Sequence, residues 1–144
     1  MKRIHVDVSY TVRRKPISSR SVRDIVIATL KAERVGDALI SVAFVGSAMM
    51  ARLNKQFLSR DSRTDVISFG LRTSKASPVI GDIYICPRVA KRNAESLSIP
   101  VKEELTRLVV HGMLHILGYD HPEGAGRTTS PMWKRQERIL DNFH

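Results

Sequence analysis

Residues 100–121, PVKEELTRLVVHGMLHILGYDH, contain the pattern on which both the fold and the candidate site depend. Apolar residues recur at helical spacing through most of this stretch. Glu103 and Glu104 fall near the start, where the positive end of a helix dipole favours carboxylates. Gly118 suits the left-handed conformation that ends a helix and reverses the chain. The stretch therefore predicts a helix from Pro100 to Leu117 followed by a glycine turn.

The histidines of this stretch have the spacing of metal ligands. His111 and His115 are four residues apart and share one face of the predicted helix, and the glycine turn can return His121 as a third ligand. Three imidazoles with an open position are typical of a catalytic zinc site, whereas a structural site is closed by four ligands. We therefore predict one Zn²⁺, preferred over nickel, copper or iron on chemistry and abundance. The alternative is a helix with incidental histidines.

The same spacing occurs in metzincin proteases, H-x-x-x-H-x-x-G-x-x-H, which place a glutamate directly after the first histidine as general base. Gly112 occupies that position here and has no side chain. The sequence therefore favours a hydrolytic metal site whose chemistry is not proteolysis.

Periodicity outside this stretch predicts short strands that alternate with helices. The predicted strands cover residues 4–8, 38–45, 65–69 and 81–86, and the other predicted helices begin near residues 18, 47, 87 and 131. Residues 54–64 are polar and basic and are predicted as a loop. We therefore predict a single α+β domain of three-layer α/β type over residues 1–144. It would contain a small mixed sheet of about four strands and about five helices.

Several side chains are expected to point inward from the predicted helices. The first helix would bury one apolar face, the second would direct its methionines inward, and the helix after Pro87 would bury its aliphatic residues. These residues are Val22, Ile25, Val26 and Leu30; Met49, Met50, Leu53 and Phe57; and Val89, Ala90 and Leu97.

The charge of the chain is the informative part of its composition. Lys and Arg number 24 against 14 Asp and Glu, a formal net charge of +10. Such a surplus attracts polyanions. We expect nucleic acid rather than an anionic membrane, because no concentrated basic amphipathic anchor is evident. The alternative is a basic surface that is merely solvated.

Targeting signals and cysteines favour the cytoplasm. The first residues do not resemble a secretory signal, and no segment approaches the roughly 20 apolar residues that span a bilayer. Cys86 is the single cysteine, which excludes an intrachain disulfide. We therefore expect a cytoplasmic protein without a membrane partner.

The segment HGMLHILGYDH at residues 111–121 closely resembles the signature of the YbeY family, bacterial endoribonucleases and rRNA maturation factors. Leu53-Asn54, residues 64–69 and residues 81–83 agree with the family in order and spacing. The resemblance implies a metal-dependent hydrolase that cuts single-stranded RNA. It also implies a role in maturing the 3′ end of small-subunit rRNA and in ribosome quality control, with the three histidines as the metal ligands.

One position departs from the family pattern, which usually has an arginine soon after the Leu-Asn pair. Phe57 is followed here by Leu58 where that arginine is expected, while Asp61 keeps its place. Arg60 and Arg63 lie in the same predicted loop and are our candidates for binding substrate phosphates. The alternative is that the substitution weakens cleavage.

The general base is not assigned by the sequence. Asp120 is expected to orient a histidine ligand, although it could serve as the base. Tyr119 is expected to pack against the fold or stack on a base, Asp82 and Ser68 are candidates for lining the cleft, and Cys86 is expected to be a buried, inert thiol.

Two other functions stay open. One is a non-catalytic RNA-binding ribosome assembly factor with a structural metal, and the other is a metallohydrolase of another substrate class.

Overall fold

A four-stranded mixed sheet forms the centre of the protein, in a computed structural model that describes residues 3–58, 66–71, 77–119 and 130–143. The strands follow the order β1-β2-β4-β3; β1 pairs with β2 and β2 with β4 in parallel, and β3 is antiparallel to β4. They are β1 (Ile4–Tyr10), β2 (Ala38–Phe44), β3 (Val66–Leu71) and β4 (Val79–Ile85). The predicted mixed sheet of an α+β fold is confirmed.

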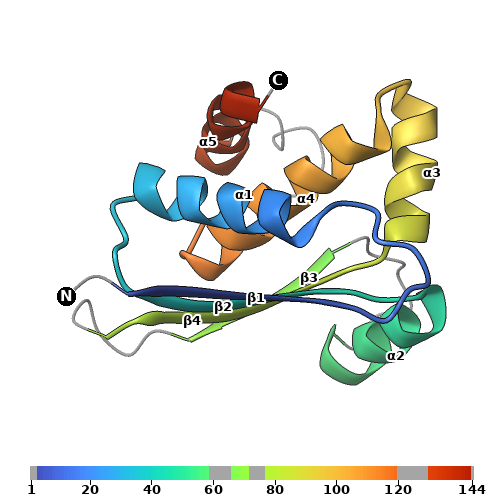
Figure 1. Ribbon diagram of the computed structural model, residues 1–144, viewed down its shortest axis with the longest axis horizontal. Coiled ribbons are helices and arrows are strands. Elements are labelled where there is room, and N and C mark those ends of the chain that lie inside the picture. Colours follow the sequence, from blue (N-terminus) through green and yellow to red (C-terminus); the bar gives the residue numbers. More distant parts are fainter. Residues whose placement is uncertain (1–2, 59–65, 72–76, 120–129, 144) are drawn as a thin grey trace.

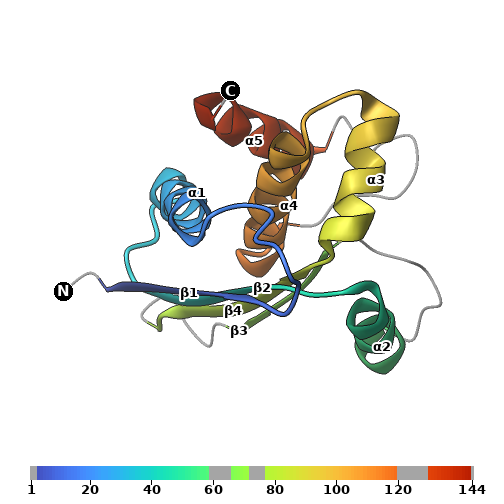
Figure 2. The ribbon, with the colours of Figure 1, turned by 45° about the vertical axis from the view of Figure 1, so that its right-hand side comes forward.

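Helices cover one face of this sheet, as Figures 1 and 2 show. Helices α1 and α4 lie on this face and α5 lies beyond them, whereas α2 lies past the end of β2, toward the other side of the sheet. The helices are α1 (Ser19–Ala32), α2 (Ser47–Leu58), α3 (Pro87–Leu97), α4 (Val101–Ile116) and α5 (Pro131–Leu140), followed by the 3₁₀ turn η2 (Asp141–Phe143).

The main apolar core fills the space between the sheet and the helices α1, α4 and α5. Strand β2 alternates buried and more exposed residues, so one face of it enters this core. The predicted inner face of α1 is confirmed, because Val22, Ile25, Val26 and Leu30 are all buried. A smaller apolar cluster holds Val45, Met50, Ile67 and Cys86. Cys86 is fully buried, as predicted.

Glycines let α4 approach the sheet closely. A Cβ at Gly112 would lie 3.1 Å from Cγ2 of Ile83 in β4. A Cβ at Gly81 would lie 2.5 Å from Cδ1 of Ile116, and one at Gly70 would lie 3.1 Å from the Ile116 Cα. Since Gly70 and Gly81 are partners in the β3–β4 register, they form one recess that receives the last turn of α4. We call this pair the glycine recess.

Several boundaries predicted from the sequence were wrong, among them the end of β1, which continues past the predicted residue 8 to Tyr10. Residues 54–58 belong to α2 and not to a loop, because the buried Asn54 donates from Nδ2 to the Met50 carbonyl at 3.1 Å within the helix. Strand β3 continues to Leu71 and β4 begins at Val79. In both strands a glycine that reads as a strand end is instead a point of close approach to α4.

Two side chains predicted to point inward are exposed. Leu97 is 59% exposed because it is the last residue of α3, beyond the buried pair Ala90 and Ala94. Met49 is 37% exposed, whereas its neighbour Met50 supplies the buried contact of α2. The side chain of Phe57 lies outside the described part of the structure. No helix among the described residues is both long and apolar enough to cross a membrane.

Candidate metal centre

Helix α4 brings two of the three predicted metal ligands together. The imidazole rings of His111 and His115 have centroids 4.7 Å apart and planes at 79°, as expected for residues one helical turn apart on one face. Both side chains are half-buried. Imidazole nitrogens are preferred donors for zinc, so the chemistry of this pair suits the predicted ion.

A buried glutamine from α5 contacts the first histidine. Nδ1 of His111 lies 2.7 Å from Oε1 of Gln136, and Gln136 is only 1% exposed. The sequence interpretation missed this residue. A signal was present, because Gln136 shares the buried face of α5 with Met132, Ile139 and Leu140, and a polar residue on an apolar face needs a partner.

An ion pair between Arg107 and Glu137 holds α5 against α4 beside this contact. Arg107 donates from Nη2 to Oε1 of Glu137 at 3.0 Å and from Nε to Oε2 at 3.3 Å, and from Nη1 to Oε1 of Glu104 at 3.5 Å. Burial alone would lower the pKa of Arg107, but its hydrogen bonds and attraction to Glu137 and Glu104 outweigh this and raise it. The guanidinium therefore stays charged and fixes the position of Glu137, the neighbour of Gln136.

The chain turns after His115 as the sequence predicts. Gly118 has a φ of +101°, its N–H donates to the His115 carbonyl at 3.0 Å, and the Tyr119 N–H donates to the Leu114 carbonyl at 2.9 Å. These bonds satisfy carbonyls at the end of the helix and reverse the chain. The first residues of the predicted glycine turn, Gly118 and Tyr119, therefore have the expected conformation.

Tyr119 is held between α1 and α5. Its side chain packs against the main core, and its pKa is raised by a hydrogen bond to Glu33 and then by burial. Glu33 also accepts from Nε of Arg135 at 2.7 Å, and Nη2 of Arg135 donates to the Ala32 carbonyl at 2.8 Å. The expectation that Tyr119 packs against the fold is confirmed.

Other residues predicted for the site fall outside the described residues. They are the third ligand His121, the phosphate-binding candidates Arg60 and Arg63, and Asp120. In the described part of the chain, no three His, Cys, Asp or Glu side chains gather closely enough to hold a metal ion. The described half of the centre is therefore the His111–His115 pair and its contact with Gln136.

The two strand residues considered for the cleft lie on opposite faces of the sheet. Ser68 is the register partner of Ile83, whose side chain lies against Gly112 of α4, so Ser68 faces the metal-binding helix. Asp82 alternates with Ile83 and lies on the other face, where it accepts a hydrogen bond from Oγ of Ser41 at 2.5 Å. Asp82 therefore does not line this centre.

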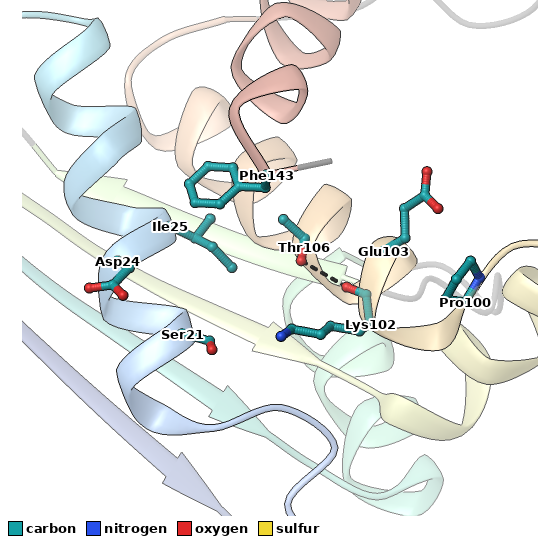
Figure 3. A pocket seen from close by; sticks show the side chains of 8 residues that line it. All are labelled: Ser21, Asp24, Ile25, Pro100, Lys102, Glu103, Thr106 and Phe143. Atoms are coloured by element: carbon teal, nitrogen blue, oxygen red, sulfur yellow. Dashed lines mark hydrogen bonds between the residues drawn. The ribbon is translucent and has the colours of Figure 1, made fainter.

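A separate cavity of about 390 Å³ lies between α1 and the first turns of α4 (Figure 3). Its lining combines acidic, basic and apolar side chains and includes none of the predicted ligands. The lining residues are Ser21, Asp24, Ile25, Pro100, Lys102, Glu103, Thr106 and Phe143. It is therefore not part of the metal centre.

The fold and the histidine pair together define an α+β protein that carries its candidate centre on a helix packed against a mixed sheet. A solution structure of a protein from Thermotoga maritima has the same fold, with a TM-score of 0.61 at 24% identity over 94% of this chain and 87% of that one. The sequence matches the family described as Endoribonuclease YbeY over residues 8–144.

Curated relatives named Endoribonuclease YbeY match most of the chain. The protein of Thermotoga petrophila is 36% identical over 76% of this chain and 70% of its own length. That of Staphylococcus carnosus is 40% identical over 74% and 73%, and that of Persephonella marina is 30% identical over 90% and 86%. The chain belongs to the YbeY family.

Proposed function

We propose that this protein is a zinc-dependent endoribonuclease that cuts single-stranded RNA. It would act in the cytoplasm, in maturing the 3′ end of small-subunit rRNA and in ribosome quality control. The observation that carries this proposal is the pair of imidazoles on α4, 4.7 Å apart, in a member of a family whose curated relatives are named endoribonucleases. Family membership supports a nuclease and hence a hydrolase.

His111 and His115 would hold the zinc ion together with His121. A bound zinc ion supplies Lewis acidity toward water and toward a phosphoryl oxygen. The chain's own part is to orient the imidazoles on a helix that the glycine recess and the Arg107–Glu137 ion pair hold in place. Arg60 and Arg63 would bind the phosphates of the RNA. They would replace the family arginine, whose position is occupied by Leu58 in this chain.

Exposed cations support a polyanionic substrate over a small neutral molecule. Helix α3 exposes Arg88, Lys91 and Arg92, and the segment between β1 and α1 exposes Arg13, Arg14 and Lys15. With a net charge of +10, these residues would raise the local concentration of RNA around the protein.

The test compares zinc content and cleavage of a single-stranded RNA in the wild type and in His115→Ala. We expect the wild type to hold one zinc ion and cut the RNA, and His115→Ala to lose both together, because one ligand of three is gone. His5→Ala is the matched control, since His5 is exposed on β1 and outside the centre. Stoichiometric zinc in His115→Ala would contradict the ligand assignment.

The same measurements separate the assembly factor from the nuclease. A wild-type protein that holds zinc, loses its fold when the metal is chelated and leaves the RNA intact would be an RNA-binding factor with a structural metal.

A further inference from the structure

The Gln136 side chain is buried with both ends of its amide engaged. Its Oε1 lies 2.7 Å from Nδ1 of His111, and its Nε2 donates to Oε2 of Glu137 at 3.2 Å. The residue is 1% exposed, so these groups have protein atoms and not bulk water as partners.

The contact with Glu137 determines which way the amide faces. A carboxylate only accepts hydrogen bonds, so the NH₂ end of the amide must point at Glu137. Arg107 holds this carboxylate through two hydrogen bonds, at 3.0 and 3.3 Å. Turning the amide round would set its oxygen against the Glu137 carboxylate. The carbonyl end of Gln136 therefore faces His111.

The orientation of the amide in turn determines the tautomer of His111. An amide oxygen has no hydrogen to donate, so Nδ1 of His111 must carry the proton of their hydrogen bond. In a neutral imidazole the other nitrogen, Nε2, then has the free electron pair. A metal-ligating histidine typically donates its second N–H to such a partner, which fixes both the tautomer and the ring orientation.

We propose that Gln136 is a positioning residue of the metal centre, which holds His111 in the Nδ1–H tautomer and so reserves Nε2 for the metal ion. This inference rests on the proposed function, because it takes His111 to be a zinc ligand. Glu137 and Arg107 contribute by preventing rotation of the amide.

Three variants test the proposal. Gln136→Leu keeps much of the volume but has no acceptor. Gln136→Glu is made together with Glu137→Gln, so that its second oxygen faces an amide NH₂ and not a carboxylate, and it restores an acceptor toward His111. Gln56→Leu is the matched control, because Gln56 is the other glutamine of the chain and is exposed on α2. Zinc affinity is measured by competition with a chromophoric chelator. We expect Gln136→Leu to bind zinc about 10–100-fold more weakly, and Gln136→Glu and Gln56→Leu to bind as the wild type does.

A second measurement does not depend on metal. In the zinc-free protein at alkaline pH, ¹⁵N–¹H correlation spectra of the neutral imidazole show which ring nitrogen carries the proton. The His111 signals are assigned by their loss in His111→Ala. We expect the Nδ1–H form in the wild type and in Gln136→Glu, and its loss in Gln136→Leu.

The outcomes separate the two levels of inference. A wild type that binds no zinc but shows His111 as the Nδ1–H tautomer would refute the metal proposal and leave the role of Gln136 toward His111 intact. An Nε2–H tautomer in the wild type, or unchanged zinc affinity in Gln136→Leu, would overturn the role of Gln136. Should Gln136→Leu fail to fold, the proposal is tested by the tautomer of His111 in the wild type and by the zinc affinity of the Gln136→Glu variant. An Nε2–H tautomer, or zinc binding weakened in the Gln136→Glu variant, would then overturn it.

Discussion

Replacement of Gly81 by alanine tests whether the glycine recess positions the last turn of α4. The new Cβ would lie 2.5 Å from Cδ1 of Ile116, 2.8 Å from Cγ2 and 2.9 Å from Cγ1. Separations this short force the isoleucine or the helix to move. Ile116 follows His115 directly, so the movement falls on the turn that carries the second candidate ligand.

The size of the effect follows from two opposing contributions. Overpacking of this kind costs about 1–3 kcal/mol, while replacing a strand glycine by alanine gains roughly 0.5–1 kcal/mol of conformational free energy. Gly81→Ala should therefore lower the free energy of unfolding by about 0–2.5 kcal/mol. In an Ile116→Ala background all three short contacts are gone, so the same substitution should stabilise the protein by roughly 0.5–1 kcal/mol.

Urea unfolding, followed by the fluorescence of the single tryptophan, Trp133, gives the four free energies of this double-mutant cycle. We expect a coupling of about 1–3 kcal/mol between Gly81→Ala and Ile116→Ala. Gly46→Ala is the matched control, because a Cβ at Gly46 meets nothing within 4 Å and should show no coupling to Ile116. Equal effects of Gly81→Ala in both backgrounds, within about 0.5 kcal/mol, would refute the role of the contact.

Two further predictions concern the core and the RNA site. Tyr10→Phe removes the hydrogen bond from the Tyr10 hydroxyl to the Ile17 carbonyl at 2.6 Å and should cost about 0.5–1.5 kcal/mol of stability at neutral pH. Burial raises the pKa of Tyr10 above 10.0, against the opposing effect of Arg23, so this contribution is present below pH 10 and is lost as the pH rises through the raised value. A stability difference between wild type and Tyr10→Phe that stays constant into this alkaline range would contradict the prediction. Arg60→Ala should slow cleavage of single-stranded RNA without loss of zinc, and an unchanged kcat/KM would remove Arg60 from the site.

The sequence predicted those elements whose periodicity is strong and locally determined. Helix α4, its glycine turn and the buried face of α1 follow from the spacing of apolar residues within a few turns of chain. The His111–His115 pair belongs to the same class, because helical geometry alone sets it. Its third partner His121, with Arg60 and Arg63, lies outside the described residues, so those assignments stay predictions.

Features that depend on tertiary contacts were not predictable in the same way. From the sequence, Gly70 and Gly81 are predicted to lie at strand ends. In the structure both lie within strands, where the absence of a side chain leaves space for Ile116. Gln136 lies 25 residues beyond His111 in the chain, and only the docking of α5 on α4 brings the two together. A local pattern cannot report a contact made by two separate helices.

Gly112 also limits how the protein could be redesigned. A protease with this histidine spacing needs a carboxylate at that position. A Cβ on Gly112 would instead point at the Ile83 side chain, so a glutamate introduced there would begin in the apolar interface between α4 and β4, where an unpaired charge is costly. Exchange of one hydrolytic chemistry for the other therefore requires simultaneous remodelling of a central strand, and a single substitution on the helix leads to an unstable intermediate.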